Sequence, residues 1–198
     1  LQKSQSLSSL IAVLHEGGEK QFNVTVPEGF TVADIDKLLA SHGLGKPGDI
    51  IDCAFHCNFD SFDFLPSKAA GSATLGYGSR IEGYLFPDTY FFFSNATSGP
   101  IVDTLKNNFL LKTDTLYKEA VAKKKNWSDI IIMASILEEE TTTSQDRRIV
   151  SGILWKRLAK NMRLQVDAPF AYAIGKNSKT LTIDEIGRAS CRERVSSP

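Results

Sequence analysis

The sequence predicts an α+β fold, in which a small strand–helix–helix unit precedes a mixed, mainly helical region. Two observations lead to this prediction: an alternating apolar run lies near the N-terminus, and helical periodicity dominates from Pro100 onward. The chain has 198 residues, of which 42% are hydrophobic. That length and composition suffice for one medium-sized domain or two small ones with a buried core.

The first predicted element is a strand over residues 20–26, where Phe22, Val24 and Val26 alternate with polar residues. Residues 1–19, which precede it, are Ser-rich and weakly patterned. We expect them to be a remnant of a preceding segment or a linker.

Two helices are expected after this strand. Thr31 can cap the first helix, because Asp34 follows three residues later in an approximate capping box, and Gly43 ends it. The second helical candidate covers residues 49–57. A Gly- and Ser-rich stretch over residues 61–80 then predicts a connection.

The second half begins with "RIEGYLFPDTYFFF", which predicts extended structure broken at Pro87-Asp88. From Pro100 onward, helices are expected over residues 101–111, 115–125, 129–140 and 143–160, and a short helix from Pro169. Ser128 occupies a good N-cap position for the helix over 129–140. The helix over 143–160 is the last before Pro169. The last of them has an apolar stripe made of Ile149, Val150, Ile153, Leu154 and Leu158.

Charge and cysteine content narrow the functional classes. Lys+Arg and Asp+Glu both number 23, so the net charge is zero and nucleic acid is not the expected partner. Cys53 and Cys57 flank His56, but three such residues without a further ligand pair do not make a zinc site. We expect neither a metal nor another cofactor. The cysteine spacing is compatible with packing inside a helix and does not establish a disulfide.

The helix expected over 129–140 ends in three consecutive glutamates. The negative end of a helix and adjacent carboxylates both disfavour ionisation, so at least one pKa should be raised. Glu138 follows Ile131, Ala134 and Ser135 at helical spacing, which predicts that it continues a buried stripe. A protonated carboxyl there could act as a general acid. The alternative is a frayed, solvated helix end without a function.

Three ordered blocks, "IEGYLFPDTYFF", "ASILEEET" and "RIVSGILWKRLAKNMRLQVDAPFAYAIG", resemble the endolytic murein transglycosylase (MltG, YceG-like) family. The resemblance spans about residues 20–184, and "FNVTVPEGFTVADIDKLLASHGL" is similar to the family's LysM-like module. It implies that the chain is truncated at both ends. The implied parts are a LysM-like module over 20–60, the connection 61–80 and an incomplete catalytic domain over 81–184.

The resemblance also implies an activity. Family members are inner-membrane proteins that face the bacterial cell wall and cut glycan strands between N-acetylmuramic acid and N-acetylglucosamine without water, leaving 1,6-anhydro ends. The family's catalytic acid maps onto Glu138, which would act first as an acid and then as a base. Implied substrate-binding residues are Glu82, Tyr84, Asp88, Tyr90, Glu140, Gln165 and Asp167. The structural alternatives are a turn at Pro87-Asp88 and core positions for both tyrosines.

Arg147 and Arg157 are candidates to pair with the carboxylates, although a plain surface position is favoured for Arg147. The expected partners are peptidoglycan glycan strands and cell-wall synthesis proteins, with the membrane reached through an anchor missing from this fragment. A non-catalytic peptidoglycan-binding module and a lysozyme-type hydrolase remain alternatives. The segment "EIGRASCRERV" resembles a translated sequencing adapter, so residues 185–198 are expected to be an adapter-derived tail that does not belong to the fold.

Overall fold

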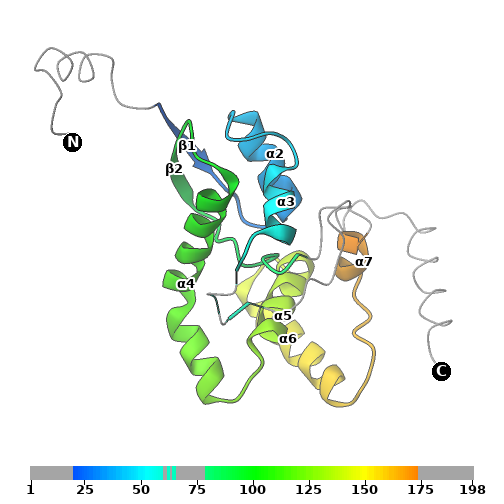
Figure 1. Cartoon of the computed structure of the whole chain (residues 1–198). Helices are drawn as coiled ribbons and strands as arrows, with labels where there is room; N and C mark the ends of the chain where they lie inside the picture. The colour runs from blue at the N-terminus through cyan, green and yellow to red at the C-terminus, as the bar shows by residue number, and fades with distance from the viewer. Residues whose placement is uncertain (1–19, 60–61, 63, 66–78, 174–198) are drawn as a thin grey trace, which may run out of the picture.

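The computed structural model describes residues 20–59, 62, 64–65 and 79–173. The fold is α+β and mostly helical, as the sequence predicts (Figure 1). In chain order its elements are β1 (Gln21–Thr25), α2 (Val32–Ser41), α3 (Asp49–His56), β2 (Thr89–Phe93), α4 (Ser98–Ala122), α5 (Trp127–Glu140), α6 (Ser144–Ala159) and α7 (Ala168–Ala173).

The two strands form one antiparallel sheet, in which Val24 of β1 lies opposite Tyr90 of β2. Period-2 alternation sends Val24, Tyr90 and Phe92 into the core, whereas Phe91 and Phe93 are exposed on the outer face. Strand β1 of the N-terminal unit therefore pairs with β2, which follows that unit in the sequence. The N-terminal unit and the helices after β2 contribute to one hydrophobic core.

The α2–α3 pair is held by local polar contacts. Thr31 and Asp34 form the predicted capping box, with both side-chain–backbone contacts at 3.2 Å. Asp36, which is buried, accepts hydrogen bonds from the N–H groups of Gly48 at 2.8 Å and Ile50 at 3.0 Å. This carboxylate satisfies the start of α3, because Gly48 at the N-cap has no side chain to do so.

The main core is rich in aromatic residues where α4 meets α5. Phe109 lies 5.2 Å from Tyr84, 6.0 Å from Phe64 and 6.3 Å from Trp127, measured between ring centroids. These rings fix the long helix α4 against the turn that contains Tyr84 and against the first turn of α5. The positions of α5 and its C-terminal end therefore depend on this core.

Three local predictions are wrong. The helices expected over 101–111 and 115–125 are one helix, α4: no Gly or Pro lies between residues 101 and 122, and Thr113 donates within it to the Phe109 carbonyl at 2.8 Å. The N-cap of α5 is Asn126, which accepts from the Asp129 N–H, rather than Ser128. Residues 80–86 are turn and coil rather than extended strand, and most of the connection 61–80 lies outside the described residues.

The apolar stripe expected on α6 is also mostly exposed. Leu154 is buried against Met133 and Ile136 of α5, and Val150 packs against this small cluster. Among the described residues, none buries the other three members of the stripe in this way. The exposed residues are Ile149, Ile153 and Leu158.

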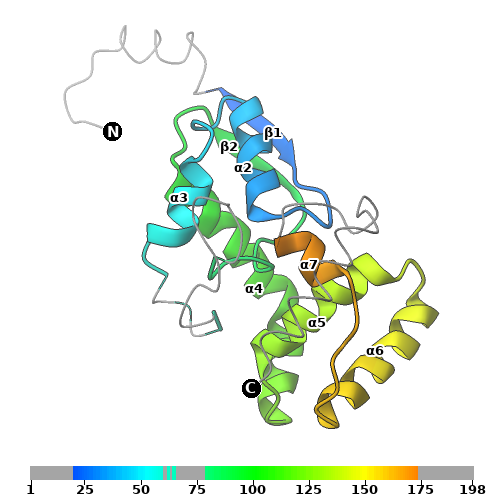
Figure 2. The same cartoon turned by 90° about the vertical axis from the view of Figure 1, so that its right-hand side faces the viewer.

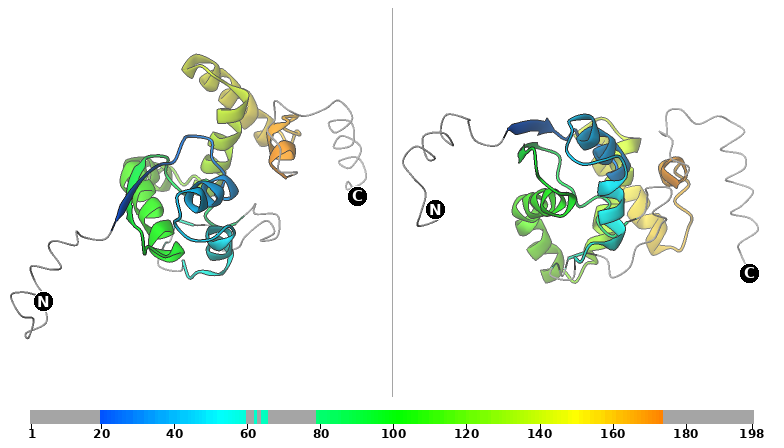
Figure 3. Two further views of the ribbon diagram at one scale, coloured as in Figure 1. Left: turned by 90° about the horizontal axis from the view of Figure 1, so that it is seen from above. Right: turned by 45° about the horizontal axis from the view of Figure 1, so that its top comes forward.

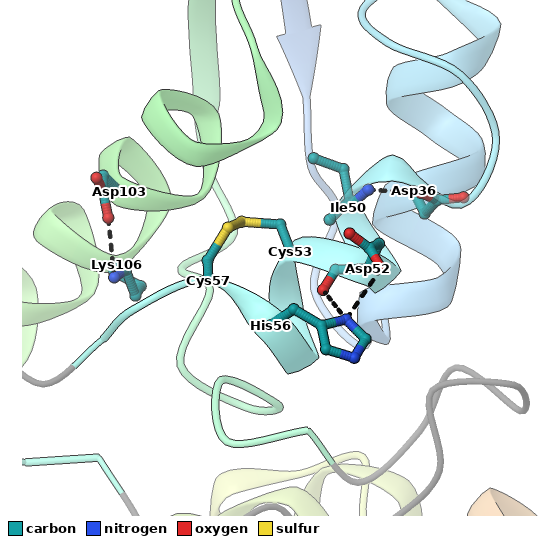
Figure 4. The surroundings of a disulfide bond; sticks show 8 residues. All are labelled: Asp36, Ile50, Asp52, Cys53, His56, Cys57, Asp103 and Lys106. Atoms are coloured by element: carbon teal, nitrogen blue, oxygen red, sulfur yellow. Dashed lines mark hydrogen bonds and ion pairs between the residues drawn. A yellow bond between two sulfur atoms is a disulfide. The ribbon is translucent and has the colours of Figure 1, made fainter.

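Cys53, near the end of α3, forms a disulfide with Cys57, which follows the helix (Figure 4). The spacing alone had left open packing within a helix. Cys57 instead leaves the helical conformation at the C-cap, with φ −67° and ψ 150°. Within the described ranges, none of the helices has the length and apolar character needed to cross a membrane.

Candidate active site

Glu138 lies in the last turn of α5 and is exposed to solvent. The expected buried stripe is wrong, because Ala134 and Ser135 are exposed as well. The buried side of α5 carries Met133 and Ile136, and Ile136 is about 200° around the helix from Glu138. The carboxyl thus stands at the surface, where a large substrate can reach it.

The pKa of Glu138 is nevertheless raised. Partial desolvation of the carboxyl is the largest cause, followed by the negative charges of Glu28 and Glu139, while Arg147 on α6 acts in the opposite direction. The predicted direction of the shift is confirmed, but its main causes lie outside the run of three glutamates. Thr141, directly after the three glutamates, is the C-cap of α5, and its hydroxyl donates to the Leu137 carbonyl at 2.6 Å.

Glu28 belongs to the loop that joins β1 to α2. This loop reaches toward the C-terminal half of α5 (Figures 2 and 3). The loop is fixed at both ends: Val26 donates to the Asp88 carbonyl at 2.9 Å, and Val32 donates to the Glu82 carboxylate at 3.1 Å. Glu28 is not among the residues predicted from the sequence, because no local pattern relates this turn to a helix so far along the chain.

Glu82 is largely buried between the start of α2 and Tyr172 of α7. Burial raises its pKa to about 6, hydrogen bonds with Val32 and Tyr172 oppose the rise, and the charge of Asp34 adds to it. The next residue, Gly83, has a φ of +81°, and a Cβ there would lie 3.1 Å from the Ile131 side chain of α5. Glu82 and Gly83 therefore join the N-terminal unit to α5 and α7.

The other residues of the "EGYLFPDTY" block have structural surroundings. Tyr84 and Tyr90 are buried in the core, and the Tyr90 hydroxyl donates to the Phe86 carbonyl at 2.6 Å. Asp88 is exposed and accepts from the Thr89 N–H at 2.8 Å and from Asn108 at 3.1 Å. These hydrogen bonds lower the pKa of Asp88.

The "LQVD" segment forms a separate part of the surface before α7. Arg157 donates to the Leu164 carbonyl at 2.6 Å and to Gln165 Oε1 at 3.0 Å. Arg157 therefore holds this loop rather than a carboxylate, whereas the charge of Arg147 acts on Glu138. Asp167 is exposed, and its carbonyl accepts the Ala171 N–H at 3.0 Å at the start of α7.

The predicted residues are thus divided between exposed positions and the core. Glu138 and Glu140 end α5, and α7, which follows Asp167, packs against α5. Tyr84 and Tyr90 point into the core instead. In the part of the chain that the structure describes, no three His, Cys, Asp or Glu side chains gather in a way that could hold a metal ion.

The sequence matches the YceG-like family over residues 1–196. Two relatives named endolytic murein transglycosylase are similar over 93% of this chain: one from Streptococcus pneumoniae, 26% identical, and one from Bacillus subtilis, 29% identical. This chain spans 36% and 54% of their respective lengths. The crystal structure of a YceG-like protein from Listeria monocytogenes shares the fold, with a TM-score of 0.70 at 22% identity over 92% of this chain and 62% of that one. The chain belongs to the YceG-like family.

Proposed function

We propose that this chain carries the catalytic acid of an endolytic lytic transglycosylase that cuts peptidoglycan glycan strands. The observation that carries the proposal is the state of Glu138: its pKa is raised although its side chain is open to solvent. A general acid needs both properties, because it must hold a proton near neutral pH and reach the substrate. The names of the similar proteins support the same substrate class.

The proposed reaction uses one carboxyl twice. Protonated Glu138 donates its proton to the glycosidic oxygen between N-acetylmuramic acid and N-acetylglucosamine as the bond from C1 to that oxygen breaks. The C6 hydroxyl of the N-acetylmuramic acid then attacks C1, and its proton passes to the Glu138 carboxylate. A 1,6-anhydro end forms, the acid is regenerated and no water is consumed. A second carboxylate, as hydrolases need, is not required.

Substrate contacts are proposed at exposed polar groups near the end of α5 and before α7. These are Glu140, Gln165 and Asp167, which can exchange hydrogen bonds with sugar hydroxyls. Glu82, Asp88 and the two buried tyrosines are better explained as supports of the surrounding structure, given their hydrogen bonds and burial. Residues 20–60 are proposed to act as a LysM-like module, which leaves 81–184 as the catalytic part.

The proposed location is the outer side of the inner membrane, with the catalytic part facing the cell wall and an anchor outside this sequence. The Cys53–Cys57 disulfide supports an extracytoplasmic site, because disulfides persist in oxidising compartments. Contacts with cell-wall synthesis proteins belong to the same proposal. The interpretation of residues 185–198 as an adapter-derived tail stays a prediction. The match to the YceG-like family extends to residue 196 and so includes most of that segment.

The proposal is tested with insoluble peptidoglycan. The parent chain and the Glu138→Gln and Glu119→Gln variants are incubated with it, and release of soluble glycan is measured. Glu119 lies on α4 and forms an exposed ion pair with Lys123, so its variant controls for the change in net charge. We expect release from the parent and Glu119→Gln, and none from a folded Glu138→Gln variant. Equal release from all three would reject Glu138 as the acid.

A second candidate is a peptidoglycan-binding module without catalysis. The exposed Phe91 and Phe93 rings on the outer face of the sheet favour it, because aromatic faces can stack on sugar rings. This candidate predicts that the chain co-sediments with peptidoglycan and releases no glycan. Loss of co-sedimentation in a Phe91→Ser, Phe93→Ser variant would then locate the binding face.

A further inference from the structure

We propose that a hollow between the α4–α5 loop and α6 binds the peptide part of peptidoglycan, with Lys124 and Lys125 holding its carboxylates. The inference rests on the proposed function and adds to it a substrate contact away from Glu138. The hollow has a volume of about 450 Å³, inside the range of roughly 300–1,000 Å³ that is typical of small-ligand sites. The residues that line it are Lys124, Lys125, Asn126, Asp129, Ile130 and Trp155.

One wall of the hollow is a short loop that its own backbone holds in place. The Lys124 N–H donates to the Val121 carbonyl and the Lys125 N–H to the Ala120 carbonyl, both at 2.9 Å. These two bonds form a Schellman motif at the end of α4. Asn126, the next residue, is already the N-cap of α5. The loop is therefore fixed by bonds that leave both lysine side chains available to a ligand.

Lys124 has a backbone conformation that favours glycine, with a φ of +52°. Glycine is the usual residue at this position of a Schellman motif, because a Cβ is disfavoured there. A lysine in this conformation therefore costs stability, as residues at functional sites often do. The cost is explained if the Lys124 side chain binds a ligand.

The charges of Lys124 and Lys125 are not balanced within the fold. Lys118 and Lys123, which precede them, form ion pairs with acids one turn back along α4. Among the described residues, no acid pairs with Lys124 or Lys125 in this way. The lining contains two lysines and one acid, Asp129, so it carries one excess positive charge. An excess of this sign favours a ligand that carries carboxylates.

A second wall is the indole of Trp155 on α6. The neighbouring Leu154 is buried against Met133 and Ile136 and so fixes α6 on α5, whereas Trp155 remains 37% exposed. The ends of α4 and α6 lie at the same end of the molecule (Figures 1 and 2). The Trp155 ring thus offers an apolar face beside the two lysines, which suits a ligand with both apolar and charged groups.

The charge decides between the two parts of peptidoglycan. The sugars of an intact glycan strand are uncharged, so they give the lysines nothing to pair with. Its peptides carry free carboxylates on a backbone with small apolar side chains. The lysines can donate to those carboxylates, Asp129 can accept hydrogen bonds from peptide N–H groups, and Trp155 can contact the side chains. The hollow therefore fits the peptide better than the glycan.

The hollow and Glu138 lie toward opposite ends of α5. Asp129 and Glu138 are nine residues apart, which is about 13 Å along the helix axis, and Ile130 and Glu138 are separated by about 80° around it. An extended peptide spans about 3.3–3.6 Å per residue, so about four to five residues cover this separation. A glycan bound at Glu138 can therefore place an attached peptide in the hollow.

The test follows the Trp155 indole N–H by NMR. The full chain is labelled with ¹⁵N, and the Trp155 signal is identified by its loss in Trp155→Phe. The probe is a synthetic pentapeptide of the kind attached to N-acetylmuramic acid, with free carboxylates. It is compared with the same peptide amidated at every carboxyl and with an uncharged N-acetylglucosamine tetramer. We expect a saturable shift of the Trp155 signal with the free-acid peptide only, and no shift of the buried Trp127.

Paired lysine variants then test the charges. Lys124→Gln, Lys125→Gln should raise the Kd of the peptide about 5- to 30-fold, as expected for two exposed charge contacts. Lys124→Arg, Lys125→Arg, which keeps both charges, should retain most of the affinity. The matched control Lys118→Gln, Lys123→Gln removes the same net charge from α4 and its end, and should change the Kd less than about twofold.

Three results would overturn the proposal: no Trp155 shift with the free-acid peptide, an equal shift with the amidated peptide, or an equal loss of affinity in the control pair. A shift with the tetramer alone would assign the hollow to the glycan instead. The titration needs no cleavage, so Glu138→Gln should bind the peptide as the parent does. A parent that binds the peptide but releases no glycan would refute the proposed activity and leave the peptide site standing.

Discussion

The Glu82 carboxylate accepts a hydrogen bond from the Val32 N–H at 3.1 Å and so joins the turn at residues 80–83 to the first residue of α2. The two residues are 50 positions apart in the sequence. The bond fixes where the N-terminal unit sits relative to α5 and α7. Its dependence on pH gives the first prediction.

Glu82 should make the protein less stable as the pH rises. Its folded pKa of about 6 exceeds the unfolded value of 4.5, so the folded state binds more protons between these values. The stability that this group contributes is therefore complete below pH 4.5 and is lost as the pH rises through 6, by about 2 kcal/mol. Glu82→Gln keeps an oxygen for Val32 and removes the titration. Denaturant unfolding from pH 4 to 8 should show the parent losing stability relative to the variant, and a constant difference would contradict the assignment.

Gly83→Ala should destabilise the fold. The new Cβ would lie 3.1 Å from Ile131, and the φ of +81° disfavours any residue with a Cβ. We expect a loss of about 1–3 kcal/mol in the free energy of unfolding. Gly152→Ala is the matched control, because a Cβ there meets nothing within 4 Å and α6 should gain about 0.5–1 kcal/mol. Equal effects of the two changes would mean that Gly83 is not held against α5.

Asp36→Ala should weaken the start of α3. It leaves the N–H groups of Gly48 and Ile50 without their acceptor, at a cost of about 2–3 kcal/mol. Asp114→Ala, which removes an exposed carboxylate paired with Lys118, should cost less than about 0.5 kcal/mol. Urea unfolding of both variants measures the difference. A small effect at Asp36 would show that water replaces the carboxylate at the helix start.

Reduction of the Cys53–Cys57 disulfide should have only a small effect on stability. The bond closes a loop with a sequence separation of four, so little chain entropy is removed from the unfolded state. Thermal unfolding with and without a reductant should differ by about 1–2 kcal/mol. A Cys53→Ala, Cys57→Ala variant retains Cys191 and should not respond to the reductant. A loss of folding on reduction would show that the bond organises more than the end of α3.

The sequence was most informative where side chains act on their own neighbours. The strand β1 and the capping box of Thr31 follow from local patterns, and the structure contains both. The continuity of α4 through residues 111–115 did not follow from a local pattern, because a stretch without Gly or Pro continues or breaks as a helix according to its packing. The choice of Asn126 over Ser128 as N-cap likewise depends on Trp127 packing into the core.

The raised pKa at the end of α5 was predictable from the sequence, whereas the surroundings of Glu138 were not. Three glutamates at a helix end indicate a raised pKa, and Glu138 has one. The side of α5 that is buried depends on which elements cover it, so the predicted stripe through Ala134 and Ser135 failed. Glu28 depends on the path of a distant loop, which no periodicity in the sequence encodes.

The most direct test of the central claim is mass spectrometry of glycan ends after purified peptidoglycan is incubated with the full chain. We predict 1,6-anhydro-N-acetylmuramic acid ends from the parent, and no new ends from a Glu138→Gln variant whose circular dichroism matches that of the parent. Anhydro ends from the Glu138→Gln variant would contradict the role of Glu138. Reducing ends from the parent would show that water is the nucleophile, and would contradict the transglycosylase reaction itself.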